Sequence, residues 1–169
     1  MILVEADVSE EWDSSTDWAQ LAEAAVRAAV AQSGVPGLLE GGPAAEVSVK
    51  FTSDEEVRSL NAAWRGKDKA TNVLSFPMVE PELLATLVRT GEGEALLGDI
   101  VLAHGICAAE AADKGLGICT HAAHLVVHGT LHLLGYDHER GDEEAETMEE
   151  TERRSLAALG IADPYEIHH

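Results

Sequence analysis

The sequence predicts an α+β domain in which a small mixed β-sheet packs against helices around a central buried helix. Segments with the period of strands and segments with the period of helices follow one another without strict alternation, which is typical of α+β folds. Residues 120–134 are apolar on nearly every side, as expected of a helix at the centre of a fold. A chain of 169 residues supplies one sizeable core, so we expect a single domain over residues 1–169.

Periodic apolar residues predict four elements in the first half of the chain. They are two helices at 16–33 and 53–66 and two strands at 46–51 and 72–76. The second helix begins with Ser53 and Glu56, which have the spacing of a capping box, and it ends at Gly66. We expect a loop at 36–43, because glycine and proline are frequent there.

The second half of the chain predicts one strand and three helices. The strand is at 96–103 and the helices are at 104–114, 120–134 and 142–159. Residues 80–94 have only a weak periodic face, so they form either a loop or a short surface helix. We assign no chemistry to them.

The chain is strongly acidic, with a net charge of −20, which at face value argues against an anionic partner. Five of its eleven basic residues nevertheless fall within twenty positions: Lys50, Arg58, Arg65, Lys67 and Lys69. A local basic patch on an acidic body is therefore compatible with the sequence. The acidic run at 139–152 is interpreted as a solvated helix face.

Composition also limits where the protein works. Every apolar run is shorter than the roughly 20 residues of a membrane span, and no basic region precedes the apolar N-terminal residues. We therefore expect a cytoplasmic protein without membrane association. Cys107 and Cys119 lack C-x-x-C spacing and are expected to be reduced, buried thiols.

The segment "HGTLHLLGYDH", residues 128–138, predicts a metal site. His128 and His132 are one helical turn apart on one face, so both imidazoles can point at a common ion. Gly135 can end the helix and turn the chain so that His138 faces the pair. Three histidines leave one position of a tetrahedral zinc open, which is the pattern of a catalytic site. We predict one Zn²⁺ per chain, bound by these three histidines.

Other residues around the motif decide between kinds of metal site. His124 continues the histidine ladder, but it is about 12 Å from His132 along a helix axis and cannot share its ion. A fourth protein ligand would make the zinc structural instead of catalytic. The candidates are Cys107, Cys119, His104 and His121.

The spacing of the three histidines is that of the metzincin metalloproteases. In zinc proteases of this kind the residue after the first histidine is the glutamate that acts as general base, and here it is Gly129. A peptidase of that mechanism is therefore not expected.

The histidine motif is accompanied by "RGKDKATNVLSFP" (65–77), "LLGDI" (96–100) and "LGIADPY" (159–165). Together these segments resemble the YbeY family of bacterial metal-dependent endoribonucleases, over most of the chain from about Asp54 onward. The resemblance implies an α+β fold, zinc on the three histidines and cleavage of single-stranded RNA. It further implies processing of the 3′ end of small-subunit ribosomal RNA and ribosome quality control. One departure is Asn72, where many relatives have aspartate.

The resemblance implies catalytic roles for Arg65 and His128. A guanidinium presents forked donors that match phosphate oxygens, so we expect Arg65 to clamp the scissile phosphate. Lys67 and Lys69 would attract neighbouring phosphates, and Asp137 would either orient a ligand histidine or form only a turn. The expected partners are ribosomal RNA and the ribosome or ribosomal proteins, and no DNA is expected.

Two other functions are compatible with the sequence. One is a zinc hydrolase of amide or peptide bonds with an unidentified base. The other is a non-catalytic ribosome-assembly factor with a structural zinc.

Overall fold

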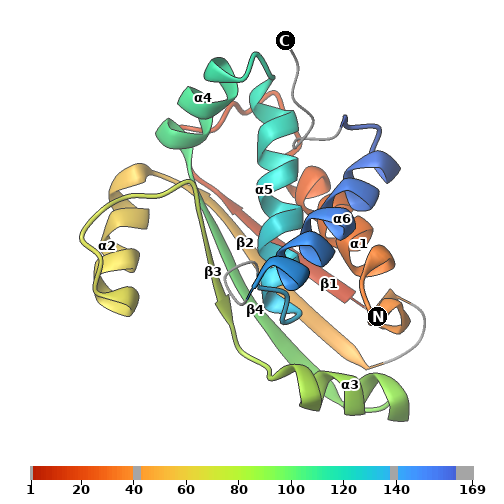
Figure 1. Cartoon of the computed structure of the whole chain (residues 1–169). Helices are drawn as coiled ribbons and strands as arrows, with labels where there is room; N and C mark the ends of the chain where they lie inside the picture. Colours follow the sequence, from red (N-terminus) through yellow and green to blue (C-terminus); the bar gives the residue numbers. More distant parts are fainter. Residues whose placement is uncertain (1, 40–42, 138–140, 163–169) are drawn as a thin grey trace.

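The computed structural model describes residues 2–39, 43–137 and 141–162 and shows the predicted α+β fold (Figure 1). A four-stranded mixed sheet has the order β1-β2-β4-β3. Its strands are β1 (Ile2–Val8), β2 (Ala44–Thr52), β3 (Val73–Pro77) and β4 (Glu94–Ala103). β1, β2 and β4 are mutually parallel, whereas β3 is antiparallel to β4 and forms one edge of the sheet.

Six α-helices accompany the sheet in the described part of the chain. They are α1 (Trp18–Gln32), α2 (Asp54–Arg65), α3 (Pro81–Thr90), α4 (His104–Asp113), α5 (Ile118–Leu133) and α6 (Asp142–Ala158). α1, α5 and α6 pack against one another and, through α1 and α5, against one face of the sheet (Figure 1). α5 is the central buried helix that the sequence predicted.

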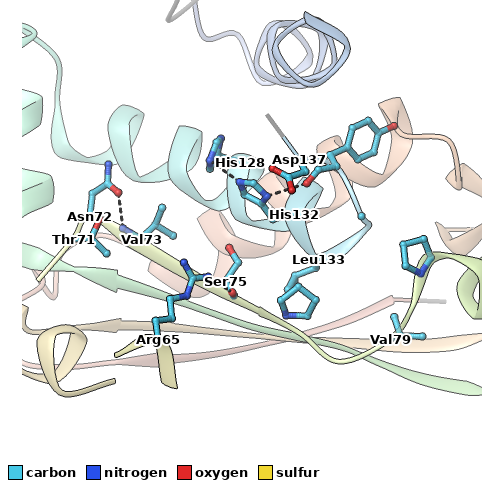
Figure 2. Close-up of a pocket in the computed structure, with 14 residues that line it drawn as sticks. Arg65, Thr71, Asn72, Val73, Ser75, Val79, His128, His132, Leu133 and Asp137 are labelled. Carbon is cyan, nitrogen blue, oxygen red and sulfur yellow. Dashed lines mark hydrogen bonds between the residues drawn. The ribbon is translucent and has the colours of Figure 1, made fainter. Parts of the chain in front are cut away.

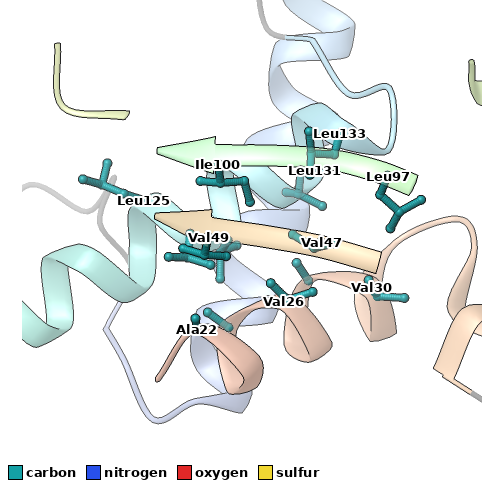
Figure 3. Packing of buried hydrophobic residues seen from close by; sticks show 14 of the residues in the cluster. Ala22, Val26, Val30, Val47, Val49, Leu97, Ile100, Leu125, Leu131 and Leu133 are labelled. Atoms are coloured by element: carbon teal, nitrogen blue, oxygen red, sulfur yellow. The ribbon is translucent and has the colours of Figure 1, made fainter. Parts of the chain in front are cut away.

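The main core lies between the sheet and these three helices (Figure 3). Val47 and Val49 of β2 point inward, and exposed residues alternate with them. α1 contributes Val26 and Val30, which are four residues apart and lie on the same face of the helix. Each of these four side chains is 1% exposed or less, so the core excludes water almost completely.

A glycine allows α5 to approach the sheet closely. A Cβ atom at Gly129 would lie 2.9 Å from Ile100 Cγ2 and 3.0 Å from Ser75 Oγ. Both distances are shorter than ordinary contacts of a side chain, so a larger residue would push α5 away from β3 and β4. The close approach brings the C-terminal half of α5 over β3.

The opposite face of the sheet is covered only in part. Val57 of α2 packs against Leu74 and Val101 in a small second core. Beyond it, Leu96 is 58% exposed, and Trp64 at the end of α2 is 73% exposed.

Most predicted elements are confirmed, with two differences. β1 was not predicted from the sequence, and it pairs with β2 over its whole length. The expected loop at 36–43 begins with a short 3₁₀-helix, Pro36–Leu39. Of the two alternatives for residues 80–94, the structure has the surface helix, α3, of which Leu84 is the buried residue. None of the described helices is long and apolar enough to cross a membrane.

The two cysteines are free thiols, as predicted. Cys107 is buried as predicted, whereas Cys119 is only partly buried, so the prediction of burial is wrong for Cys119. Burial raises the pKa of the Cys107 thiol to about 12, with further contributions from the carboxylates of Glu110 and Asp54. Cys107 therefore stays protonated near neutral pH and does not act as a thiolate.

Candidate active site

A pocket of about 570 Å³ lies between the C-terminal half of α5, strand β3 and the end of α2 (Figure 2). Its polar rim includes Arg65, Asn72, His128, His132 and Asp137. The structure therefore brings together the arginine and two of the histidines that were predicted from separate motifs.

His128 and His132 point their Nε2 atoms at each other, 3.0 Å apart. Nδ1 of His132 lies 2.9 Å from the carbonyl oxygen of Tyr136, and Nδ1 of His128 contacts a carboxylate oxygen of Glu152. A carbonyl or carboxylate oxygen accepts hydrogen bonds, so each Nδ1 carries the proton and donates it. If both rings are neutral, each Nε2 then presents its lone pair to the other ring.

Two facing lone pairs are favourable only when a cation lies between them. Two nitrogen ligands at zinc distances in tetrahedral geometry are about 3.3 Å apart. The observed separation of 3.0 Å is close to that value, and neutral imidazoles are suitable zinc ligands. His128 and His132 thus fit the predicted ion.

The third predicted ligand, His138, lies outside the described residues. Gly135 has a φ of +100°, a conformation that suits glycine, and α5 ends at Leu133 just before it. The predicted helix end is therefore confirmed. Within the described ranges, no group of three or more histidine, cysteine or acidic side chains is arranged to hold a metal ion.

The four candidates for a fourth ligand have other surroundings. His121 Nε2 lies 2.8 Å from Glu110, and the ring of His104 packs edge-on against Trp12. The thiol of Cys107 lies 3.6 Å from the carbonyl oxygen of Asn72 and that of Cys119 lies 3.8 Å from the hydroxyl of Thr16.

Glu152 is a site residue that the sequence did not reveal. It is fully buried on α6, and its two oxygens contact His128 Nδ1 and His124 Nε2, the latter at 3.2 Å. The interpretation of the acidic run as a solvated face is therefore wrong at this position. A signal existed, because Glu152 lies four residues from both Met148 and Leu156, on the buried stripe of α6.

Arg65 reaches the pocket from the other side of the sheet. It is the last residue of α2, and its Nη2 donates to the carbonyl oxygen of Ser75 at 2.9 Å. Its guanidinium also lies 5.8 Å from the centre of the Phe76 ring. β3 is an edge strand, so Arg65 can pass around it. The Ser75 bond uses one of five N–H donors, and the fork borders the pocket.

The basic cluster is smaller than the sequence indicated. Lys50 pairs with Glu56 at 2.8 Å, and the hydrogen bond to this ammonium lowers the pKa of the Glu56 carboxyl. Arg58 pairs with Asp68 at 2.8 Å. Lys67 and Lys69 are exposed in the loop after α2 and do not line the pocket.

Asn72, the position where the resemblance led us to note a departure, borders the pocket. Its Nδ2 donates to Glu110 at 3.0 Å, and its Oδ1 accepts from the backbone N–H of Val73 at 2.7 Å. Asn72 thereby connects the pocket to the His121–Glu110 contact. Asp137 lines the pocket. That it orients a ligand histidine stays a prediction.

Comparison with known proteins identifies the family. The family model described as "Endoribonuclease YbeY" matches residues 5–160. A protein of that name from Rhizorhabdus wittichii is 53% identical over 99% of this chain and 98% of its own length. One from Sphingopyxis alaskensis is 50% identical over 98% of both chains.

A solution structure of a Thermotoga maritima protein supports the fold independently. It has a TM-score of 0.54 and 23% identity, and the match covers 98% of this chain and 100% of that one. At this identity the likeness concerns the fold alone. The family match and the two relatives are more decisive, and they show that the chain belongs to the YbeY family of endoribonucleases.

Proposed function

We propose that this protein is a zinc-dependent endoribonuclease that cleaves single-stranded RNA. The observation that carries the proposal is the pair of Nε2 atoms on His128 and His132, which face each other beside a pocket bordered by Arg65. His138 would complete the ligand set. The names of the relatives, which are endoribonucleases, support RNA as the substrate.

The chain's own residues would divide the work of phosphodiester cleavage. A zinc ion, when bound, supplies Lewis acidity toward a phosphate oxygen and lowers the pKa of a coordinated water. His128 and His132 would hold the ion, with their Nδ1 protons directed away from it. Arg65 would bind the non-bridging phosphate oxygens through its forked donors and stabilise the charge that builds up there.

Two observations weigh against the other candidate functions. The metzincin general base is absent at Gly129, where even a Cβ would lie within 3.0 Å of Ile100 and Ser75, so amide hydrolysis would need another base. A structural zinc needs a fourth protein ligand, and the four side chains considered for that role contact other partners.

The biological substrate would be ribosomal RNA. We place the protein in the cytoplasm, in maturation of the 3′ end of small-subunit ribosomal RNA and in ribosome quality control. Lys67 and Lys69 would add attraction for phosphates next to the cleavage site. A net charge of −20 opposes binding of bare RNA, so productive binding would depend on the ribosome or its proteins.

Replacing Arg65 by alanine tests this function. We expect Arg65→Ala to keep the zinc content and fold of the wild type and to lower the rate of single-stranded RNA cleavage by about 100-fold, the typical effect of removing one charge-stabilising donor. Zinc is measured by metal analysis and cleavage with a labelled oligonucleotide.

Arg58→Ala is the matched control, because Arg58 is on the same helix and pairs with Asp68 outside the pocket. It should cleave RNA at the wild-type rate. Equal activity of wild type and Arg65→Ala, or a zinc-free wild type that cleaves at full rate, would contradict the proposed function.

A further inference from the structure

A buried carboxylate lies behind the histidine pair. Glu152 is 0% exposed, and its two oxygens contact two different imidazoles, those of His124 and His128. These two histidines are one turn apart on α5, whereas Glu152 comes from α6. One side chain thus ties the site to a second helix.

The surroundings explain why a charged group can be buried here. Met148 and Leu156, one turn away on either side, place this stripe of α6 in the core. The hydroxyls of Thr151 and Ser155 donate to carbonyl oxygens of their own helix. A buried carboxylate is costly unless it accepts hydrogen bonds, so its contacts with the two imidazoles are central to its stability.

We propose that Glu152 is a positioning residue of the metal site, an inference that rests on the proposed function. Its carboxylate accepts a hydrogen bond from the Nδ1–H of His128. This hydrogen bond fixes the tautomer and the ring orientation that direct Nε2 at the ion. His124 is not a ligand and holds the second oxygen of the carboxylate in place. A carboxylate behind a ligand histidine also makes that ligand more basic and strengthens metal binding.

The two ligand histidines differ in this respect. His132 is oriented by the backbone carbonyl of Tyr136, which no side-chain substitution removes. His128 is oriented by the side-chain carboxyl group of Glu152, which a substitution can remove. Substitutions at Glu152 therefore act on one ligand and leave the orientation of the other.

Zinc affinity, measured by competition with a chromophoric chelator, tests the proposal. We expect Glu152→Ala to bind zinc about 10- to 100-fold more weakly than the wild type, the usual effect of losing such a partner. Glu152→Gln keeps the volume and one acceptor oxygen, so its affinity should lie between the two. Glu150→Gln, an exposed change on the same helix, should match the wild type.

A second measurement separates positioning from a merely structural role. Nitrogen-15 NMR of the metal-free protein reports the tautomer of each histidine. His128 should be protonated on Nδ1 in the wild type and lose that preference in Glu152→Ala, whereas His132 should be unchanged in both.

The outcomes are distinguishable. Wild-type zinc affinity in both Glu152 variants, or an unchanged His128 tautomer in Glu152→Ala, overturns the positioning role and leaves the proposed function intact. A wild-type protein that binds no zinc overturns the proposed function and this inference with it. If Glu152→Ala is unfolded by circular dichroism, Glu152→Gln decides alone, and wild-type affinity in that variant overturns the inference.

Discussion

The two ends of the histidine ladder on α5 use the same residue type in different ways. At the N-terminal end His121 is 1% exposed, and its Nε2 lies 2.8 Å from Glu110. At the C-terminal end His128 and His132 are partly buried, border the pocket and point Nε2 at each other. His124 lies between the two ends and contacts Glu152.

The difference shows what turns a histidine into a candidate ligand. Helical spacing places His121, His124, His128 and His132 on neighbouring turns, so spacing alone does not separate them. The separation comes from the oxygen acceptors, which occupy Nδ1 of His128 and His132 but Nε2 of His121. His121 therefore contributes to structure, whereas His128 and His132 are the candidate ligands.

The largest expected effect comes from the C-terminal end. His132→Ala leaves too few ligands for a tetrahedral zinc. Zinc affinity should therefore fall by more than the roughly 100-fold that is lost when a hydrogen-bond partner of a ligand is removed. His121→Asn, at the other end of the ladder, should bind zinc as the wild type does. Chelator competition measures both variants. Full zinc retention in His132→Ala would mean that the two ends of the histidine ladder do not differ in metal binding.

Sequence periodicity was sufficient to locate α5 and the His128–His132 pair. Apolar residues surround the pair, and a turn-forming glycine follows at position 135. Both signals are local, because helical geometry relates residues three and four positions apart. The pairing of Arg65 with this site came from the family resemblance, since Arg65 reaches the pocket around β3 from the opposite face.

Two features escaped prediction because their causes are non-local. β1 does alternate, with Ile2 buried and Leu3 half exposed, but its parallel partner β2 begins about forty residues later. Glu152 lies in a strongly acidic run, and its charge concealed its place on the buried stripe of α6. Its burial is understandable only once the histidines of α5 are opposite it.

A smaller effect is expected at the N-terminal end, and it should concern stability. Glu110→Ala removes the acceptor of His121 and Asn72, which leaves His121 Nε2 buried without its partner. A buried polar group without a partner costs about 1–3 kcal/mol, so the free energy of unfolding should fall by about that amount. Urea denaturation measures it.

Asp113→Ala, an exposed acidic change on the same helix, is the control and should leave stability nearly unchanged. Zinc affinity should be the same in wild type and Glu110→Ala. A loss of zinc in Glu110→Ala would mean that the two ends of the ladder are coupled.

The smallest effect should appear as a pH dependence of stability. Burial lowers the pKa of His121 from its ordinary value of 6.5, and the hydrogen bond with Glu110 opposes this shift without cancelling it. The unfolded chain therefore binds a proton at a higher pH than the folded protein does. The contribution of His121 is fully present above pH 6.5 and is lost as the pH falls from there to the folded pKa.

The difference between wild type and His121→Asn isolates this contribution, because the other histidines are common to both proteins. Unfolding free energies are measured in zinc-free buffer between pH 8 and about pH 5.5, and one proton changes them by at most about 1.4 kcal/mol per pH unit. We expect the wild type to lose stability relative to His121→Asn as the pH falls. A relative gain would mean that the carboxylate of Glu110 outweighs burial, and His121 would then be a charged partner of Glu110 instead of a neutral core histidine.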